Sequence, residues 1–201
     1  MRELKIINAF LVNDGKISKQ DIHVVGAKIV KIGNRIKSSD NAEVFDATGK
    51  YVFPGLIDDQ VHFREPGLTH KATIETESKA ALAGGITSFL EMPNTNPQTT
   101  TIKEWESKNK LAEKTSYANY GFMFGGTNNN LDQILKLDSK RVPALKLFLG
   151  SSTGNMLVDN PEVLKNIFEN TDLVIAVHCE DETTITKNLK AAKVKYGENI
   201  P

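Results

Sequence analysis

The sequence predicts an α/β protein in which a small strand-rich module precedes a larger unit of alternating strands and helices. Three observations support this fold class. The first fifty residues hold short β-type runs between turn signals, the pattern changes near Tyr51 to apolar runs that alternate with helix-length segments, and this alternation occurs five times. We therefore expect two domains, residues 1–50 and residues 51–201.

The first domain is expected to consist of four short strands, at residues 4–12, 21–25, 28–32 and 43–45. Turn residues separate these runs, namely Asn13-Asp14-Gly15, Gly26 and Gly33. The spacing is too short for helices between them, so the module is expected to be rich in strands.

The second domain carries five apolar runs of strand length, mostly without strict alternation, at residues 52–61, 86–92, 118–124, 144–149 and 173–178. Such runs are typical of buried parallel strands. Five βα units fill only part of an eight-unit (β/α)8 barrel of the TIM type. Either the sheet is open, or the chain contains part of a barrel.

The helices between these strands have start and stop signals of their own. Thr101 with Glu104 predicts a capping box, Asn130 with Gln133 a similar pair, and Asn160-Pro161-Glu162 an N-cap, an N1 proline and a first-turn acid. The pair Gly84-Gly85 is expected to end the first helix.

Charge and composition exclude several classes of function. Lys plus Arg equals Asp plus Glu at 25 each, so no overall field attracts nucleic acid or an anionic membrane. No run approaches the ~20 apolar residues that a membrane span requires. The single Cys179 excludes an internal disulfide, and the N-terminus shows no targeting pattern. We expect a cytoplasmic protein that acts on a small molecule.

Two histidines follow the first and the fifth predicted strand of the second domain. His62 ends the first run and His178 the fifth. The carboxyl ends of barrel strands surround one cavity, so the two imidazoles could face a single metal ion. The alternative is that each is a structural imidazole that is hydrogen-bonded within the fold, which is the commoner role of an isolated histidine.

Three further polar side chains stand at or near strand ends. Lys146 lies inside an apolar strand, where an amine is usually paired, neutral or modified, unless it reaches the surface. Arg64 could hold an anionic group with its planar fork, or be an ordinary surface arginine. Asn94 could orient a ligand, although an asparagine in such a turn usually serves the turn itself.

Together these residues resemble the dihydroorotases of the amidohydrolase superfamily. The stretch Pro54 to Gly67, PGLIDDQVHFREPG, matches the family's first motif, and MPNT at 92–95 and LKLFLG at 145–150 follow in family order. The resemblance covers essentially the whole chain. It implies an α/β fold with a partial (β/α)8 TIM-type barrel of about five βα units, preceded by a small β-sandwich module. It also implies zinc-dependent, reversible hydrolysis of L-dihydroorotate to N-carbamoyl-L-aspartate in pyrimidine biosynthesis.

The resemblance assigns roles to individual residues. His62 and His178 match zinc ligands, and Lys146 matches a lysine that, when carboxylated, bridges two zinc ions. Asp58, on the strand of His62, is expected to be a further ligand or an acceptor behind the ligands. Arg64 and Asn94 match residues that hold the substrate carboxylate. One or two zinc ions are therefore expected.

Two departures from the family pattern bear on the site. Gln60 stands where the family has its first histidine, and an amide oxygen is a poorer zinc ligand than an imidazole. This change is compatible with a single-metal or asymmetric site, a relaxed first ligand, an inactive relative, or a structural hydrogen bond. The family's catalytic aspartate is expected beyond residue 201, so this chain alone is expected to be inactive.

Two rival functions remain open. One is a hydantoinase or allantoinase, although Arg64 suits a substrate that carries a carboxylate. The other is a non-catalytic, dihydroorotase-like subunit that assembles with a transcarbamoylase, which Gln60 favours and the retained His62, Lys146 and His178 oppose. Assembly into a homo-oligomer is a further expectation.

Overall fold

The computed structural model describes residues 2–150 and 154–200, which form two compact units. The first unit ends at Leu56 and the second begins at Ile57. The change of sequence pattern at Tyr51 lies a few residues earlier, because the short strand at Tyr51–Val52 pairs with the first unit.

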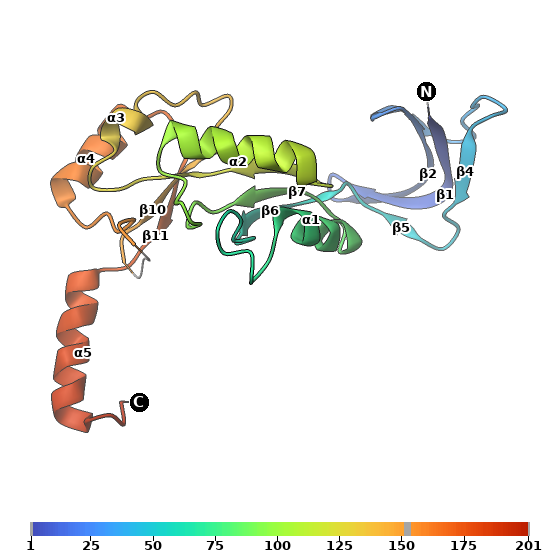
Figure 1. Cartoon of the computed structure of the whole chain (residues 1–201). Coiled ribbons are helices and arrows are strands. Elements are labelled where there is room, and N and C mark those ends of the chain that lie inside the picture. The colour runs from blue at the N-terminus through green and yellow to red at the C-terminus, as the bar shows by residue number, and fades with distance from the viewer. Residues whose placement is uncertain (1, 151–153, 201) are drawn as a thin grey trace. The chain divides into compact units, whose positions relative to one another are not determined.

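The first unit is a five-stranded sheet (Figure 1). Its strands are β1 (Glu3–Asn13), β2 (Lys16–Val25), β3 (Lys28–Gly33), β4 (Glu43–Asp46) and β5 (Tyr51–Val52), with β3, β2, β1 and β4 adjacent in that order. β1 and β2 form an antiparallel hairpin, and β4 and β5 run parallel to β1. The four predicted strands are present, and hairpin pairing extends β2 back to Lys16. The described strands form one sheet, so the sandwich remains a prediction.

A hydrogen-bonded cluster forms around Glu3 in this sheet. The Glu3 carboxylate lies 2.7 Å from Nε2 of His23 and accepts from the backbone N–H of Ser39 at 3.0 Å and from the Ser39 hydroxyl. These bonds, those from Ser39 first, lower the pKa of Glu3 to about 2. The cluster joins β1, β2 and the segment before β4.

The predicted strand at residues 52–61 is wrong as a single element. The chain leaves β5 at Val52, passes through Phe53-Pro54-Gly55 without strand pairing, and begins β6 (Leu56–Val61) in the other unit. Proline lacks a backbone N–H and the residue before it is restricted, so pairing stops there. The apolar run contains the crossing between the two units.

The second unit contains five βα units, which confirms the α/β class (Figure 1). The strands are β6, β7 (Ile86–Glu91), β8 (Asn119–Phe122), β9 (Phe124–Gly125), β10 (Leu145–Phe148) and β11 (Ile175–His178). β6, β7 and β8 are neighbours in one sheet, and β9, β10 and β11 in another. The pairs β7/β8, β9/β10 and β10/β11 are parallel.

The predicted strand at residues 118–124 is divided between these two sheets. Met123 separates β8 from β9, and its N–H donates to the carbonyl of Glu91 in β7. The next N–H, of Phe124, donates to the carbonyl of Ala144, beside β10. The strand therefore changes partners at Met123, which a continuous apolar run does not reveal.

Five helices follow the strands: α1 (Ile74–Ala83), α2 (Ile102–Thr115), α3 (Leu131–Ile134), α4 (Pro161–Asn170) and α5 (Glu182–Tyr196). Thr101 and Asn160 are N-caps as predicted, since their side chains accept from the Glu104 N–H and from the N–H groups of Glu162 and Val163. The reciprocal bond that would complete the predicted capping box, from the Thr101 N–H to the Glu104 side chain, is absent among the described residues. Gly84 ends α1 as expected.

Asn130 is the N-cap residue of α3 as predicted, but the capping box expected with Gln133 is wrong. Its side chain makes no cap bond to α3. Instead it accepts from the N–H of Thr127 and donates to the carbonyls of Thr100 and Gly125. The asparagine ties together two loops that follow neighbouring strands, because its amide satisfies buried backbone groups that a helix cap would leave unpaired.

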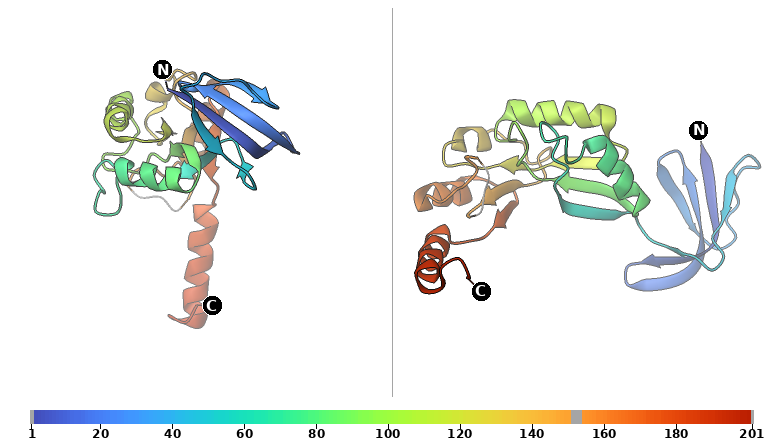
Figure 2. Two further views of the ribbon diagram at one scale, coloured as in Figure 1. Left: turned by 90° about the vertical axis from the view of Figure 1, so that its right-hand side faces the viewer. Right: turned by 60° about the horizontal axis from the view of Figure 1, so that its bottom comes forward.

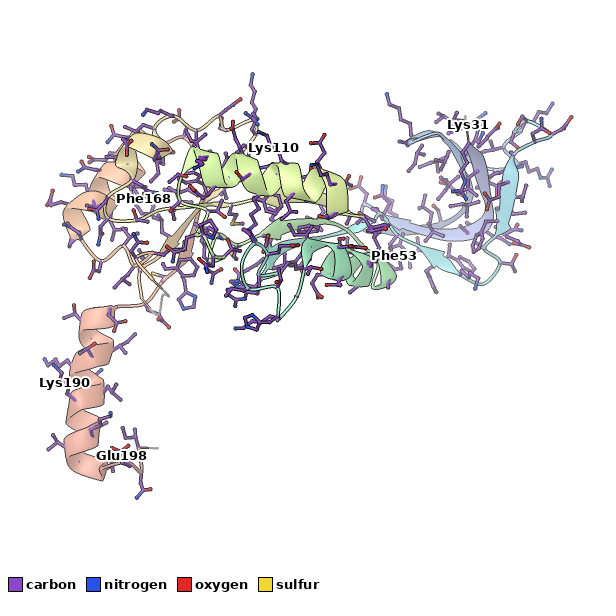
Figure 3. The ribbon with its side chains drawn as sticks, in the orientation of Figure 1. Lys31, Phe53, Lys110, Phe168, Lys190 and Glu198 are labelled. Carbon is purple, nitrogen blue, oxygen red and sulfur yellow. The ribbon has the colours of Figure 1, made fainter. Side chains whose placement is uncertain are left out.

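The core lies between the strands and α1 to α4. Its largest buried side chains include Phe89, Phe122 and Phe124, and the indole N–H of buried Trp105 donates to the Phe122 carbonyl at 2.9 Å. In contrast, α5 has no buried residue and extends away from the rest of the second unit (Figure 2). Figure 3 shows Lys190 of α5 and Lys110 of α2 pointing outward. Within residues 2–150 and 154–200, no helix is long and apolar enough to cross a membrane.

Candidate active site

The loops after β6 and β7 bring His62 and Asn94 into contact. β6 lies beside β7, and the N–H of Met92 donates to the carbonyl of Val61, so the two strands end side by side. Nδ1 of His62 lies 2.9 Å from Oδ1 of Asn94. A carboxamide oxygen only accepts, so Nδ1 carries the hydrogen and Nε2 keeps its lone pair. The contact therefore leaves Nε2 as the ring nitrogen that could accept a hydrogen bond or bind a ligand.

The surroundings of His62 favour its neutral form. Burial lowers the pKa of the imidazole, the positive charges of Arg64, Lys146 and Lys108 lower it further, and the hydrogen bond with Asn94 opposes the shift. Metal binding requires a neutral imidazole. Burial and the neighbouring positive charges thus favour the neutral imidazole, and the hydrogen bond with Asn94 fixes which ring nitrogen carries the hydrogen.

Arg64 is held in an uncommon backbone conformation. Its φ is 70°, in the left-handed region, and its N–H donates to Oε1 of Glu91 at 3.1 Å. Its guanidinium lies 3.5 Å from the carbonyl of Asn94, at the outer limit of a hydrogen bond. The guanidinium lines a hollow together with Leu68, Lys71, Thr95, Asn96, Gln98, Gly154 and Asn155.

The loops that line this hollow interlock closely. The N–H of Asn96 donates to the carbonyl of Pro66 at 3.0 Å. Gly67 has φ 84°, and a Cβ there would lie 1.9 Å from the Asn96 carbonyl oxygen. Only glycine fits at such an approach. The loop that carries Arg64 is therefore fixed against the loop that carries Asn94.

Lys146 is buried in β10, with 3 % of its surface exposed. Its Nζ lies 5.2 Å from the ring centre of Phe148, and it has no hydrogen bond or ion pair with any described residue. Burial lowers the pKa of this amine. A buried amine without a polar partner is unfavourable, so Lys146 is suited to be neutral or chemically modified.

His178 stands at the end of β11, in register with Phe148 of β10. The two rings lie 6.2 Å apart, and Nε2 of His178 lies 3.3 Å from a carboxylate oxygen of Glu180. Its side chain is 46 % exposed. The Phe148 ring therefore lies near both His178 and Lys146, and no described contact joins His178 to His62.

Asp58 and Gln60 are two residues apart in β6, so their side chains point to the same side of the strand, and His62 follows the strand's last residue, Val61. Oδ1 of Asp58 accepts from the backbone N–H of Gln60 at 3.1 Å. Gln60 itself is exposed. The structure leaves Gln60 available to a ligand and gives Asp58 a local partner.

The donor set fits a metal ion that uses a modified lysine. The described residues contain no group of three His, Cys, Asp or Glu side chains placed to hold a metal. Two observations favour a metal here: among the described residues, neither the Lys146 amine nor Nε2 of His62 has a hydrogen-bond partner. A carboxylated lysine would supply the oxygen ligands that the other residues lack.

Sequence reasoning missed two charged residues beneath these loops. Glu91 ends β7, and Lys108 lies in α2. Their exposed fractions are 0 % and 1 %, and Nζ of Lys108 lies 2.8 Å from Oε2 of Glu91. A signal was present for Lys108, because it shares the buried face of α2 with Trp105 and Ala112, at helical spacing.

The amidohydrolase family matches residues 51–199. A dihydroorotase of Methanosarcina acetivorans is 35 % identical over 185 residues, covering 90 % of this chain and 39 % of that protein. An allantoinase of Deinococcus radiodurans is 38 % identical over 151 residues, covering 75 % of this chain and 34 % of that protein. This chain thus spans about two fifths of the length of such relatives.

The fold is similar to part of a solved hydantoinase. L-hydantoinase (dihydropyrimidinase) from Arthrobacter aurescens superimposes with a TM-score of 0.91 at 30 % identity, over 98 % of this chain and 45 % of that one. These matches confirm the resemblance predicted from the motifs at Pro54 to Gly67, 92–95 and 145–150. The chain belongs to the amidohydrolase family.

Proposed function

We propose that the protein is a dihydroorotase, which reversibly hydrolyses the cyclic amide of L-dihydroorotate to N-carbamoyl-L-aspartate in pyrimidine biosynthesis. The observation that carries this proposal is Arg64, fixed beside His62 and Asn94 by its backbone bond to Glu91. A guanidinium at this place suits a substrate with a carboxylate. Dihydroorotate carries one, and the dihydroorotase relatives support the same choice.

The metal in this proposal is zinc, one or two ions, held by His62, His178 and carboxylated Lys146, with Asp58 and Gln60 as further oxygen donors. When bound, zinc would polarise the ring carbonyl and lower the pKa of the attacking water. Carboxylation joins the neutral Lys146 amine to CO₂ and releases a proton, so a lowered amine pKa favours it.

The remaining residues bind and orient the substrate. Arg64 holds the carboxylate at the hollow that it lines with Lys71 and Asn96. Asn94 uses its oxygen to fix the His62 ring, which leaves its NH₂ group to donate to the same carboxylate. Proton transfer to the leaving nitrogen needs a base that these residues do not supply, and the family's aspartate would fill that role.

The substrate test uses the complete gene product, purified with zinc and bicarbonate. Turnover is measured on L-dihydroorotate, hydantoin and allantoin. We expect the highest kcat/KM for dihydroorotate. Hydrolysis of hydantoin or allantoin without dihydroorotate turnover would contradict the substrate assignment and support the related cyclic amidohydrolases.

Gln60 supports one rival, a non-catalytic subunit that assembles with a transcarbamoylase. Zinc content separates the two, because the enzyme should hold one to two zinc ions per chain and the assembly subunit none. Gln60→His should strengthen zinc binding, since imidazole is the better ligand. Asp59→His is the matched control, because its side chain points to the opposite side of β6.

A further inference from the structure

Glu91 and Lys108 form the most deeply buried ion pair among the described residues. The ammonium of Lys108 also donates to the carbonyl of Met92 at 3.3 Å and lies 4.9 Å from the ring centre of Phe122. Burial raises the pKa of Glu91 and lowers that of Lys108, and each charge opposes the shift in the other. The pair joins α2 to the end of β7.

The other oxygen of Glu91 serves a different element. Oε1 accepts from the backbone N–H of Arg64 at 3.1 Å, and the N–H of Phe63 also stabilises the carboxylate. Both amides belong to the loop after β6. One buried carboxylate therefore connects Lys108 of α2 with the loop that carries His62 and Arg64.

Arg64 needs such a restraint. A side-chain-bearing residue with φ 70° occupies the left-handed region, which is unfavourable unless the surroundings hold it there. An anionic acceptor makes a stronger bond to a backbone N–H than a neutral acceptor does. Lys108 keeps Glu91 anionic in a buried place, where a lone carboxylate would be protonated.

We propose that Glu91 and Lys108 are positioning residues, which hold the loop after β6 so that the Arg64 guanidinium faces the substrate hollow. Neither side chain would touch the substrate, because both are buried. The hydrogen bonds from the loop backbone to Glu91 are present whatever reaction the protein catalyses. The inference rests on the proposed function only for the statement that Arg64 binds the substrate carboxylate.

The test compares two double variants, Glu91→Gln/Lys108→Met and Glu91→Leu/Lys108→Met. Both remove the buried charges, and the new side chains are similar in size. Only the glutamine keeps an oxygen that can accept from the Arg64 N–H. Circular dichroism and thermal melting show whether both variants of the complete gene product are folded.

The first readout is amide hydrogen exchange at Phe63 and Arg64. We expect exchange at least about tenfold faster in the leucine variant than in the glutamine variant, since one hydrogen bond to the loop is lost. Equal exchange in two folded variants would overturn the inference. If the leucine variant does not fold, Glu91→Asp decides instead, because it keeps the charge but is one methylene too short to hold both partners.

The second readout is kinetic. In the leucine variant, KM for dihydroorotate should rise at least about tenfold over the glutamine variant, while KM for dihydrouracil, the same ring without the carboxylate, should be equal in both. A merely structural role would raise both KM values together and overturn the inference. If exchange changes as expected but the wild-type protein does not turn over dihydroorotate, the positioning stands and the proposed function fails.

Discussion

The two histidines of the candidate site stand in contrasting surroundings. On the β6 and β7 side, His62 is bonded to Asn94, and the neighbouring Arg64 is bonded to Glu91 above a buried ion pair. On the β11 side, His178 is half exposed and meets Glu180 at 3.3 Å, and α5 after it buries no residue. Lys146 is buried, and no polar partner for it is found within residues 2–150 and 154–200.

This contrast separates two kinds of preorganisation. The β6 and β7 loops are fixed by hydrogen bonds and close packing within the described chain, so the groups proposed to recognise the carboxylate are in place before any ligand binds. Of the groups proposed for the metal, His62 belongs to these fixed loops, whereas His178 meets only Glu180 and Lys146 has no polar partner among the described residues. We infer that recognition is built into the fold, whereas the metal side is completed by the ligand itself.

The largest expected effect is on activity, from Lys146→Met. The variant removes the proposed carboxylated ligand, so kcat/KM for dihydroorotate should fall by about 10³-fold or more, several kcal/mol. The melting temperature should be unchanged or higher, because an apolar side chain replaces a buried amine. Exposed Lys140→Met is the control. Full activity in Lys146→Met would remove this lysine from the site.

The next effect is on stability, on the fixed side of the contrast. Lys108→Ala leaves Glu91 buried without its cation, and the free energy of unfolding should fall by about 3–5 kcal/mol. Lys110→Ala, on the exposed side of the same helix, should change it by less than about 0.5 kcal/mol. Urea unfolding measures both. Similar values for the two variants would mean that the buried pair does not support these loops.

A smaller effect compares the two histidines directly. His62→Ala loses the bond to Asn94 and should destabilise the protein by about 1 kcal/mol. His178→Ala should change stability by less than about 0.5 kcal/mol, since its described polar contact is with Glu180, two residues away, and not with another loop. Both should lose zinc. A larger stability loss for His178→Ala would show that the β11 side is fixed as firmly as the other.

The smallest effect concerns a similar contrast within the first unit, between the bonded Glu3 and the exposed Glu43, which pairs with Arg2. The lowered pKa of Glu3, about 2, gives stability that is present above the ordinary value near 4.5 and lost as pH falls toward 2. Glu3→Gln should make the free energy of unfolding depend less on pH between about 4.5 and 2. Amide exchange in β1 reports it, with Glu43→Gln as the unaffected control.

Local patterns predicted most of the elements, because strand-length apolar runs and side-chain caps depend on nearby residues. Asn160 caps α4 as expected. Asn130 has the same type of signal but bonds to Thr127, Thr100 and Gly125, because the neighbouring loop offers its amide better partners. The break at Met123 likewise depends on partners far away in the chain, the carbonyls of Glu91 and Ala144.

The motifs identified the candidate site residues His62, Arg64, Asn94, Lys146 and His178. They did not identify the buried residues that hold these side chains in place. A glutamate at the end of an apolar strand and a lysine in a helix have many ordinary explanations. Only the fold shows that Glu91 and Lys108 meet at 2.8 Å and that the carboxylate also holds the Arg64 backbone. Long-range pairing of charges carries no local periodicity.

The most direct test of the central claim is the preference for a carboxylate-bearing ring. We compare kcat/KM for dihydroorotate and dihydrouracil in the complete, zinc-loaded gene product and in its Arg64→Gln variant. The account predicts that the wild-type protein strongly prefers dihydroorotate. In the variant, kcat/KM for dihydroorotate should fall by about 10²-fold or more, because a bidentate charged contact is lost. Its kcat/KM for dihydrouracil should change little. An unchanged ratio between the two substrates, or a wild-type protein that does not turn over dihydroorotate, would contradict it.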